Sequence, residues 1–498
     1  MSRVLDYLNS DVFNSVYGNE LPLIKSPSIK AICDELYYAI KAGEPIFVYG
    51  DYDADGFCSN MVWEEVLSAL YDVPPIHFMY QERQHTVDKD ILRQVVFGNA
   101  RVVLICDSGS GLEDRRIIDA LRTQGKLPIV IDHHVYAGDY ASDSQVYRMF
   151  NSWEERAILN SSEVCGAYAS LLVANYLCKD YFSRPLPFNA SVYALCAMYA
   201  DSVDMSTPEA RALYNLVAQT NLPGPGLFSS LNRWKYEYTR RLFSFIIVPK
   251  INACFRTERY EPLNKALSTR DKYSLAACAS MFEDVHAAAR ELVELMTPLF
   301  ELASYGNIVL AVHEAVPDTR LLHVRNFSGI IANKIADREK CLAIVLIKDA
   351  GVYAGSYRDY FNRSLLDTFQ VFCDANGHDQ AFGLNITDYN DFTRHLAILS
   401  KQLVDRAQTD NLVLSSTLID DEDDINVVAL YNEYMNIKPK AVIVHRCDYA
   451  NLTSSTKWNK FYDVGLPMQI RTTAPLTTGS VVSLEPCMTS CVELRCIE

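Results

Sequence analysis

The sequence predicts an α/β protein: a parallel-sheet domain joined by a long helix to a smaller α/β domain, with a small β-rich module at the C-terminal end. Three observations support this fold class. Short apolar segments alternate with helical patterns over about the first 210 residues. One long amphipathic pattern follows, and a second group of strand patterns comes after it.

The first part contains three predicted strands, each continuously apolar, at residues 45–49, 101–105 and 128–131. Helical patterns lie at residues 61–70 and 164–178. A fourth apolar segment, residues 192–200, is treated as equivalent to the strands. Continuously apolar strands are typical of a parallel sheet that helices cover on both faces.

A long amphipathic helix is predicted over residues 275–299, because apolar residues recur at helical spacing until Pro298. It connects to a second α/β domain with strands at residues 308–312, 342–347 and 352–356. A third module begins after about Leu412. The predicted parts are therefore residues 1–215, 216–304, 305–405 and 406–498, the last of uncertain fold.

Composition limits the class of protein. The 498 residues include 46 basic and 62 acidic side chains, a formal charge of −16, which argues against non-specific coating of nucleic acid but allows a local basic groove. No apolar run approaches the roughly 18 residues of a membrane span, and the N-terminus lacks a signal-peptide pattern. The 14 cysteines are scattered, and several lie in apolar segments, as buried reduced thiols do. We therefore expect a cytoplasmic protein.

Acidic and histidine residues follow each of the four apolar segments. They are the segment 50–56 (GDYDADG), Asp107, the segment 132–134 (DHH) and Asp201. Because the carboxyl ends of parallel strands meet at one edge of a sheet, these side chains should converge. One such segment alone is more often a solvated turn or a calcium loop, so the prediction rests on all four.

Such a cluster requires cations, since like charges a few Å apart repel one another. Mixed carboxylate and imidazole ligands suit Mn²⁺ or Mg²⁺. Two ions about 3.5–4 Å apart would activate a water and stabilise both the entering and the leaving oxygen of a phosphoryl group. The predicted chemistry is metal-dependent phosphoester hydrolysis.

In chain order, Asp51 with the segment 53–56 (DADG), Asp107, the segment 132–134 and Asp201 resemble the four motifs of the DHH phosphoesterases. Three further segments resemble motifs of the RecJ branch of that family, the single-strand-specific 5′→3′ exonucleases: 249–256 (PKINACFR), 355–358 (GSYR) and 376–383 (NGHDQAFG). The resemblance covers roughly residues 45–385. It implies a DHH catalytic domain over 1–215, a connector with the long helix over 216–304 and a DHH-associated substrate-binding domain over 305–405.

The resemblance also implies roles for individual residues. It implies metal ligation by Asp53, Asp55, Asp107, His133 and Asp201. It implies that Asp51 and His134 act next to the metals or on the phosphate, and that Asp132 orients the histidines. It implies substrate contacts from Arg83, Asn252, Arg256, Ser356, Arg358 and His378. The chain departs from the family at Asn376, Tyr357, Cys254 and Phe255, where glycine or alanine is expected, so the pocket for the 5′ end could be reshaped.

The implied function is hydrolysis of single-stranded DNA from its 5′ end to 5′-mononucleotides, with two Mn²⁺ or Mg²⁺ ions, in DNA repair and recombination. Single-stranded DNA is the implied partner, a single-strand-binding protein or a helicase is a candidate protein partner, and no membrane is involved. Two alternatives stay open: a DHH phosphodiesterase acting on short oligonucleotides or cyclic dinucleotides, and a non-catalytic replication-associated scaffold. The filled ligand positions argue against the scaffold.

Two segments outside the motifs have open interpretations. The basic, aromatic segment 233–241 could guide a single strand or form one face of a packed helix. Cys487, Cys491 and Cys496 lie close together near His445 and Cys447, but their spacings match no strong zinc template, and reduced thiols are the expected state.

Overall fold

The computed structural model describes most of residues 21–403, and short segments, chiefly strands, between 412 and 497. Within 21–403 the description omits residues 72–75, 80–98, 157–163, 204, 206, 219, 221, 223, 234–237, 270–271, 315–323, 350, 361–362 and 379–380. The chain divides into two compact units. Residues 1–255, 260–281 and 411–498 form the first unit, and residues 256–259 and 282–410 form the second. The predicted boundaries at 215, 304 and 405 stay predictions.

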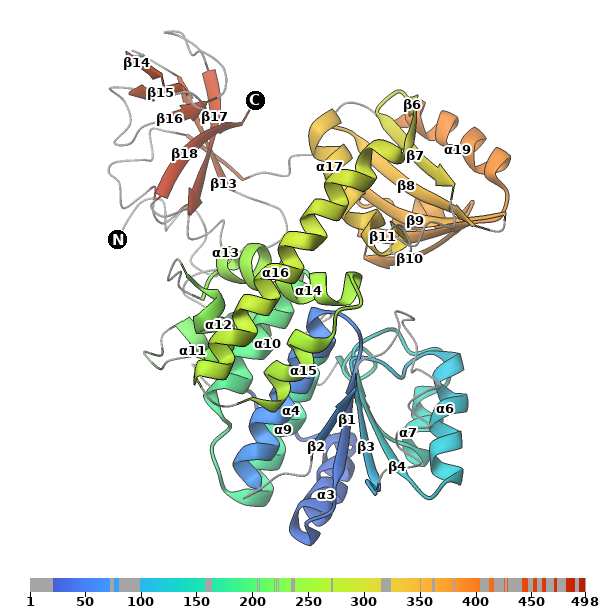
Figure 1. Cartoon of the computed structure of the whole chain (residues 1–498), viewed down its shortest axis with the longest axis vertical. Coiled ribbons are helices and arrows are strands. Elements are labelled where there is room, and N and C mark those ends of the chain that lie inside the picture. Colours follow the sequence, from blue (N-terminus) through green and yellow to red (C-terminus); the bar gives the residue numbers. More distant parts are fainter. Residues whose placement is uncertain are drawn as a thin grey trace. The chain divides into compact units, whose positions relative to one another are not determined.

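The first unit contains a five-stranded parallel sheet in the order β2-β1-β3-β4-β5 (Figure 1). Its strands are β1 (Ile46–Gly50), β2 (Ile76–Met79), β3 (Val102–Cys106), β4 (Leu127–Asp132) and β5 (Arg148–Asn151). The three predicted strands are confirmed as β1, β3 and β4. The strands β2 and β5 were not predicted, because four residues each give too short a pattern.

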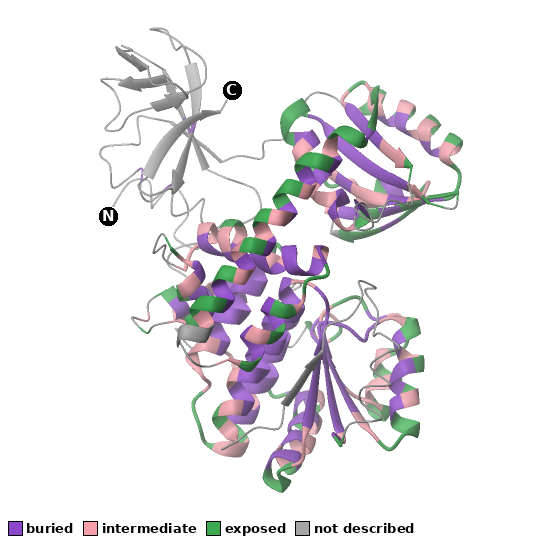
Figure 2. Cartoon of the chain, in the orientation of Figure 1, coloured by how far each residue is buried: buried purple, intermediate pink, exposed green. Residues whose placement is uncertain are grey.

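Helices cover both faces of this sheet (Figure 1). One face packs against α6, whose Ile117, Ile118 and Leu121 meet alternate residues of β1, β3 and β4. The other face contacts α4 and α9, and α4 is buried on nearly all sides because α9 and α10 also pack against it (Figure 2). The helical segments are α3 (Pro27–Ala42), α4 (Ala54–Leu70), α6 (Leu112–Thr123), α7 (Tyr140–Val146), α9 (Gly166–Tyr176), α10 (Phe188–Ala200), α11 (Pro208–Ala218), α12 (Gly226–Leu231), α13 (Arg240–Leu242), α14 (Val248–Arg256) and α15 (Glu261–Ser268), with π-helical turns at Leu177–Tyr181 and Phe243–Ile247.

Two helix predictions need correction. The helix expected from residue 61 begins at Ala54, because Asp53 caps it and the acidic segment forms its first turn. The fourth apolar segment, residues 192–200, forms the C-terminal part of helix α10 and is not equivalent to a strand. Its small and large apolar side chains are buried against α4, α9 and α11, so a helix buried on most sides gave a strand-like pattern.

The second unit is built on a six-stranded mixed sheet in the order β10-β11-β9-β8-β7-β6. The predicted long helix is confirmed as α16 (Lys272–Met296), followed by a 3₁₀ turn at Thr297–Leu299. The predicted strands are confirmed as β7 (Ile308–Glu314), β8 (Leu342–Asp349) and β9 (Val352–Asp359). The other elements are β6 (Glu301–Tyr305), a 3₁₀ turn at Val324–Phe327, α17 (Ser328–Glu339), α18 (Leu366–Gln370), β10 (Asp374–His378), β11 (Ala381–Ile386) and α19 (Tyr389–Gln402).

The predicted β-rich module forms a seven-stranded sheet in the order β12-β13-β17-β18-β16-β15-β14. Its strands are β12 (Leu412–Ser415), β13 (Ala441–Arg446), β14 (Asn451–Ser454), β15 (Asn459–Tyr462), β16 (Ile470–Thr472), β17 (Val481–Met488) and β18 (Val492–Ile497). The backbone pairing of these strands is described.

The ten cysteines whose side chains are described are all free thiols, and nine of them are buried, as predicted. Burial raises the pKa of several, for example that of Cys106 to about 12, so they are protonated apolar side chains at neutral pH. Among the helices that the structure describes, none is long and apolar enough to cross a membrane.

Candidate metal centre

Two carboxylates of the predicted set come from the start of α4. Asp53 is the N-cap of this helix, and its Oδ1 accepts hydrogen bonds from the backbone N–H of Asp55 at 2.8 Å and of Gly56 at 3.0 Å. Asp55 is buried, and its two oxygens accept from the N–H groups of Gly166 at 2.7 Å and Ala167 at 2.8 Å, the first two residues of α9. Helix N-termini favour carboxylates because their first N–H groups lack partners within the helix. Asp55 therefore links the starts of α4 and α9.

Asp51 lies between β1 and α4 and is also buried. Its Oδ1 accepts a hydrogen bond from the N–H of Tyr52 at 2.8 Å. The turn that brings it beside α4 is tight, since a Cβ atom on Gly56 would lie 2.2 Å from the Asp51 carbonyl oxygen. Only glycine fits at residue 56, which explains the glycine of the DADG segment.

Asp107 follows β3 in a left-handed conformation, with φ of 60°. Its N–H donates to the carbonyl of Ile131 at 2.9 Å, which ties the turn to β4. The side chain is buried, and its Oδ1 makes no hydrogen bond to any residue that the structure describes. A buried carboxylate oxygen without a donor is unfavourable unless a cation meets it.

Asp132 ends β4 and organises the two histidines. Its Oδ1 accepts from the N–H of His133 at 2.7 Å and from Nδ1 of His134 at 2.8 Å, and its Oδ2 accepts from the N–H of Ser110 at 3.0 Å. Burial opposes ionisation of Asp132, but the charge and hydrogen bond of His134 outweigh it and hold the pKa of Asp132 below its ordinary value. Conversely, although burial acts against the imidazolium, Asp132 raises the pKa of His134 to about 10. His134 is therefore held as a cation by a fully buried carboxylate.

His133 lies at the centre of the cluster. Its Nε2 is 3.2 Å from Asp107 Oδ1 and 3.8 Å from Asp55 Oδ2, and its Nδ1 is 3.8 Å from Asp201 Oδ2. Its side chain is 12% exposed. Two groups of residues each bring one ligand atom per residue within 4.8 Å of the others: Asp55, His133 and Asp201, and Asp107, Asp132, His133 and His134.

Asp201 reaches the cluster from a helix. It is the C-cap of α10, and its N–H donates to the carbonyl of Ala197 at 2.9 Å. Asp201 lies in the cluster as expected, but it follows a helix and not a strand. α10 packs on α4 and α9, and this packing delivers its last residue to the carboxyl edge of the sheet.

The carboxylates of the cluster repel one another. Burial, with the charges of Asp201 and Asp53, raises the pKa of Asp55 to about 8. Burial, with the charges of Asp55, Asp53 and Asp51, raises the pKa of Asp107 well above its ordinary value. Divalent cations would relieve both the repulsion and the missing hydrogen bond of Asp107. The residues present therefore fit a centre for hard divalent ions.

Ser110 and Asn151 also support the site, although the sequence did not indicate them. The buried Asn151 ends β5 opposite Asp132, and its Nδ2 donates to Ser110 Oγ at 2.8 Å and to the carbonyl of His134 at 2.9 Å. The two residues thus hold the turn that carries the histidines. A prediction of strand β5 would have placed Asn151 next to the end of β4 and so indicated its role.

The predicted substrate-binding residues are placed as follows. Asn252 and Arg256 are half-buried on α14, and the carbonyl of Arg256 accepts from Asn326 Nδ2 at 3.2 Å. In the second unit, Ser356 and Arg358 lie on β9 beside the start of α17. Ser356 Oγ is 2.8 Å from Ser328 Oγ, and a Cβ atom on Gly329 would lie 2.8 Å from Arg358 Nη2.

Three of the departures from the family pattern point into the protein core. Tyr357 is fully buried, and its ring stacks on that of Phe382 with centroids 4.1 Å apart. Since successive residues of a strand face opposite sides, the ring lies away from Ser356 and Arg358. Cys254 and Phe255 are likewise buried. Asn376 is exposed, and its Nδ2 donates to Asp374 Oδ1 at 2.6 Å.

Several sequence predictions lie outside the described residues. They are Arg83, Cys447, Cys491, residues 234–237 and the side chains of His378, His445, Cys487 and Cys496. Of the basic, aromatic segment, Tyr238 is described, and its ring stacks on the buried Phe243 with centroids 6.1 Å apart.

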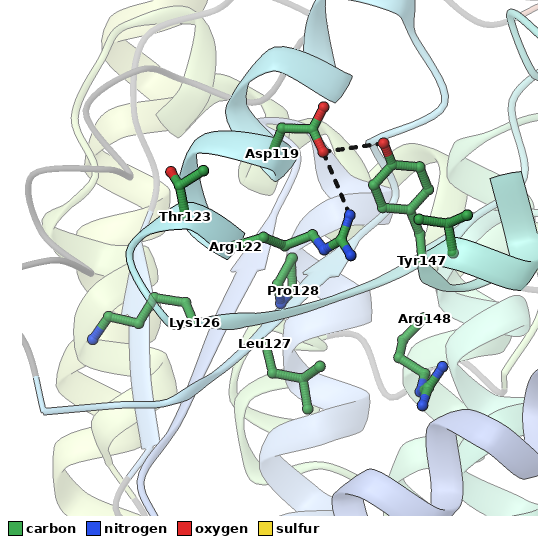
Figure 3. A pocket seen from close by; sticks show the side chains of 9 residues that line it. Asp119, Arg122, Thr123, Lys126, Leu127, Pro128, Tyr147 and Arg148 are labelled. Atoms are coloured by element: carbon green, nitrogen blue, oxygen red, sulfur yellow. Dashed lines mark hydrogen bonds and ion pairs between the residues drawn. The ribbon is translucent and has the colours of Figure 1, made fainter.

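A pocket of about 580 Å³ lies at the opposite, amino-terminal edge of the same sheet (Figure 3). It is lined by Asp119, Arg122, Thr123, Lys126, Leu127, Pro128, Val146, Tyr147 and Arg148. Its three cations already have partners: Arg122 with Asp119, Arg148 with Glu35 and Lys126 with the carbonyl of Ala100. The pocket contains none of the residues of the acidic cluster, and its cationic side chains are already paired with other groups of the chain.

Comparisons with known proteins agree with this architecture. Residues 45–198 match the family model described as DHH family, N-terminal domain. The single-stranded-DNA-specific exonuclease RecJ of Bacillus subtilis (strain 168) is 23% identical over 377 residues, which are 72% of this chain and 45% of that protein. The chain thus spans less than half the length of that curated relative.

Two solved structures share the fold. The crystal structure of RecJ from Thermus thermophilus in complex with Mn²⁺ superposes with a TM-score of 0.74 at 16% identity, covering 100% of this chain and 75% of that one. The Mg²⁺ complex of RecJ from the same organism gives a TM-score of 0.68 at 17% identity, covering 100% and 74%.

The parallel sheet and most of the aspartates and histidines at its carboxyl edge lie within residues 45–198, so this segment is similar to the N-terminal domain of the DHH family. The chain is similar to RecJ in fold and, over 377 aligned residues, in sequence.

Proposed function

We propose that this chain is a metal-dependent exonuclease that hydrolyses single-stranded DNA from the 5′ end and releases 5′-mononucleotides. The observation that carries the proposal is the convergence of ligand atoms from α4, β3, β4 and α10 around His133. The activity printed for the B. subtilis relative supports the choice of substrate. The proposal places the chain in DNA repair and recombination in the cytoplasm, where a single-strand-binding protein or a helicase would be its protein partner.

We assign Asp53, Asp55, Asp107, His133 and Asp201 as ligands of two ions, Mn²⁺ or Mg²⁺, which are the ions bound in the Thermus RecJ structures. Such ions, when bound, would activate a water and neutralise the charge of a transferring phosphoryl group. Asp132 has its oxygens engaged by Ser110, His133 and His134, so it orients the histidines.

His134 has a separate role in this proposal. With Nδ1 bonded to Asp132, its other ring nitrogen, Nε2, is left for a ligand, and the side chain is 53% exposed. A cationic imidazole is a good donor to a phosphate oxygen. His134 would therefore hold the scissile phosphate, and Asp51 would lie beside the ions.

In the second unit, we propose a phosphate-binding site at the start of α17. The hydroxyls of Ser328 and Ser356 and the guanidinium of Arg358 come together there. The N-cap residue Phe327 provides no side-chain hydrogen bond to the helix. Serine hydroxyls and a guanidinium at a helix start are both suited to phosphate oxygens. Asn252, Arg256, Arg83 and His378 are the further proposed contacts to the strand.

The test uses a long 5′-phosphorylated single strand labelled at either end, with Mn²⁺ or with EDTA. We expect the 5′ label to appear at once in mononucleotides, the 3′ label to stay in shortening strands, and EDTA to stop the reaction. The Asp107→Ala variant should be inactive and otherwise folded. Cleavage of dinucleotides or cyclic dinucleotides alone would replace the exonuclease by the small-substrate phosphodiesterase. Absence of all cleavage, with the biological role intact in Asp107→Ala, would favour the scaffold.

A further inference from the structure

We propose that the amino terminus of α9 is a structural part of the metal centre, and that Gly166 and Ala167 are positioning residues for Asp55 and Asp107. The inference rests on the proposed metal site and adds residues that lie outside its four motifs. It concerns how the ligands are held in place, not which residues they are.

The first reason is that α9 has no cap of its own. Its N-cap residue, Cys165, makes no side-chain hydrogen bond to the helix, and its first turn contains no acidic residue. The N–H groups of Gly166 and Ala167 instead donate to the two oxygens of Asp55, which precedes them by 111 and 112 residues. Asp55 is thus fixed by two backbone amides, and a bidentate contact fixes the plane of a carboxylate as well as its position.

The second reason is steric. A Cβ atom on Gly166 would lie 2.5 Å from Asp107 Oδ1 and 2.6 Å from Asp107 Cβ. The absence of a side chain at residue 166 therefore lets Asp107 approach the start of α9. The same glycine that donates to one carboxylate makes room for the other.

The third reason is the position of α9 in the first unit. Residues 166–175 are all buried, so the helix is held on every side. It contacts α4, β3, β4 and α10. Asp55 lies in α4, and Asp107, His133 and Asp201 directly follow β3, β4 and α10. A rigid element that touches every ligand-bearing element is suited to fix the distances between the ligands.

The central experiment removes the amide that donates to Asp55 Oδ1. In Ala167→Pro the N–H that donates to Asp55 Oδ1 is lost, while proline is tolerated in the first turn of a helix because that N–H has no partner within the helix. Glu113→Pro is the matched control, since Glu113 is the exposed second residue of α6 and lies at the same helical position. Mn²⁺ binding is measured by calorimetry and by the electron paramagnetic resonance of bound Mn²⁺, without substrate.

We expect Ala167→Pro to weaken Mn²⁺ binding roughly tenfold or more, as loss of a hydrogen bond to a charged group would. We expect the Glu113→Pro variant to bind Mn²⁺ as the unmodified chain does. Gly166→Ala should also weaken Mn²⁺ binding, because Asp107 must move. Wild-type affinity in both Ala167→Pro and Gly166→Ala would overturn the inference.

A measurement on the unmodified chain covers the case in which the variants do not fold. Titration with Mg²⁺ should shift the NMR signals of the Gly166 and Ala167 amides much more than those of the Leu112 and Glu113 amides at the start of α6. Equal shifts would overturn the inference. If the unmodified chain bound neither Mn²⁺ nor Mg²⁺, the proposed function itself would fail, which is a different outcome from wild-type affinity in the variants.

Discussion

Asn151 shows how a residue outside the motifs supports the site. Its amide donates to Ser110 Oγ and to the carbonyl of His134, and its Oδ1 accepts from the N–H of Glu154 at 3.1 Å. Ser110 in turn donates its N–H to Asp132. The position of the histidine turn therefore depends on one fully paired amide side chain, which is 2% exposed.

We predict that Asn151→Asp lowers strand cleavage more than tenfold and destabilises the fold by about 1–3 kcal/mol, because a carboxylate cannot make the two donations and places a charge near Asp132. Asn175→Asp is the matched control, since Asn175 is also buried and donates to the carbonyl of Pro22 at 3.4 Å. The control should lose stability but keep its activity per folded molecule. Equal activity in the two folded variants would contradict the prediction.

A second prediction at the residue scale concerns Asp107. Because the folded pKa of Asp107 is raised above the unfolded value, the metal-free fold disfavours ionisation of this carboxyl group. This lowers the stability at pH values above the unfolded pKa and has no effect below it. We expect Asp107→Asn to abolish cleavage and to increase the free energy of unfolding in EDTA by about 1 kcal/mol at pH 7. Denaturant unfolding in EDTA measures this change. A less stable metal-free variant would show that Asp107 is needed for folding.

At the scale of single elements, the ends of helices position most of the residues of the site. Asp53 caps the start of α4, α9 begins against Asp55, and Asp201 caps the end of α10. The phosphate-binding site that we propose in the second unit also lies at a helix start, that of α17. Helix ends carry unpaired backbone groups, so they hold ligands and ligand-bearing side chains at fixed positions.

We predict that Gly329→Ala weakens strand binding three- to tenfold without loss of stability. The added Cβ atom meets the end of the Arg358 side chain, which must move, whereas alanine favours the helix by up to about 1 kcal/mol over glycine. KM for the labelled strand should rise, and kcat should change little. Asn333→Ala, at an exposed position of the same helix, is the control and should leave KM unchanged. An unchanged KM in Gly329→Ala would remove Arg358 from the proposed strand contacts.

At the scale of the whole molecule, the chain consists of two compact units, and the acidic cluster belongs entirely to the first. The five-stranded sheet and the core around it belong to the first unit, and the six-stranded sheet and its core belong to the second. Metal binding and strand binding by the second unit should therefore be separable, and unfolding should not be a single two-state step.

We predict that calorimetric unfolding shows two transitions and that Mn²⁺ raises the Tm of only one of them. An ion at 100 times its Kd stabilises the fold that binds it by about 2.7 kcal/mol. The Asp107→Asn chain should show the same two transitions with no effect of Mn²⁺. Equal shifts of both transitions would indicate that metal binding couples the two units.

The sequence by itself determined the α/β class, the main strands, the long helix and the set of acidic and imidazole residues, because these depend on local patterns and on residue types that follow them. The three-dimensional structure was needed to show that 192–200 is helical, that β2 and β5 complete the sheet, and that Asn151, Gly166 and Ala167 form hydrogen bonds to the segments that carry the ligands. These features depend on contacts between residues far apart in the chain. Such contacts leave no periodic pattern in the sequence. Many different apolar segments can pack against the same buried surface, and a hydrogen bond from a backbone amide does not depend on the side chain of the donor residue.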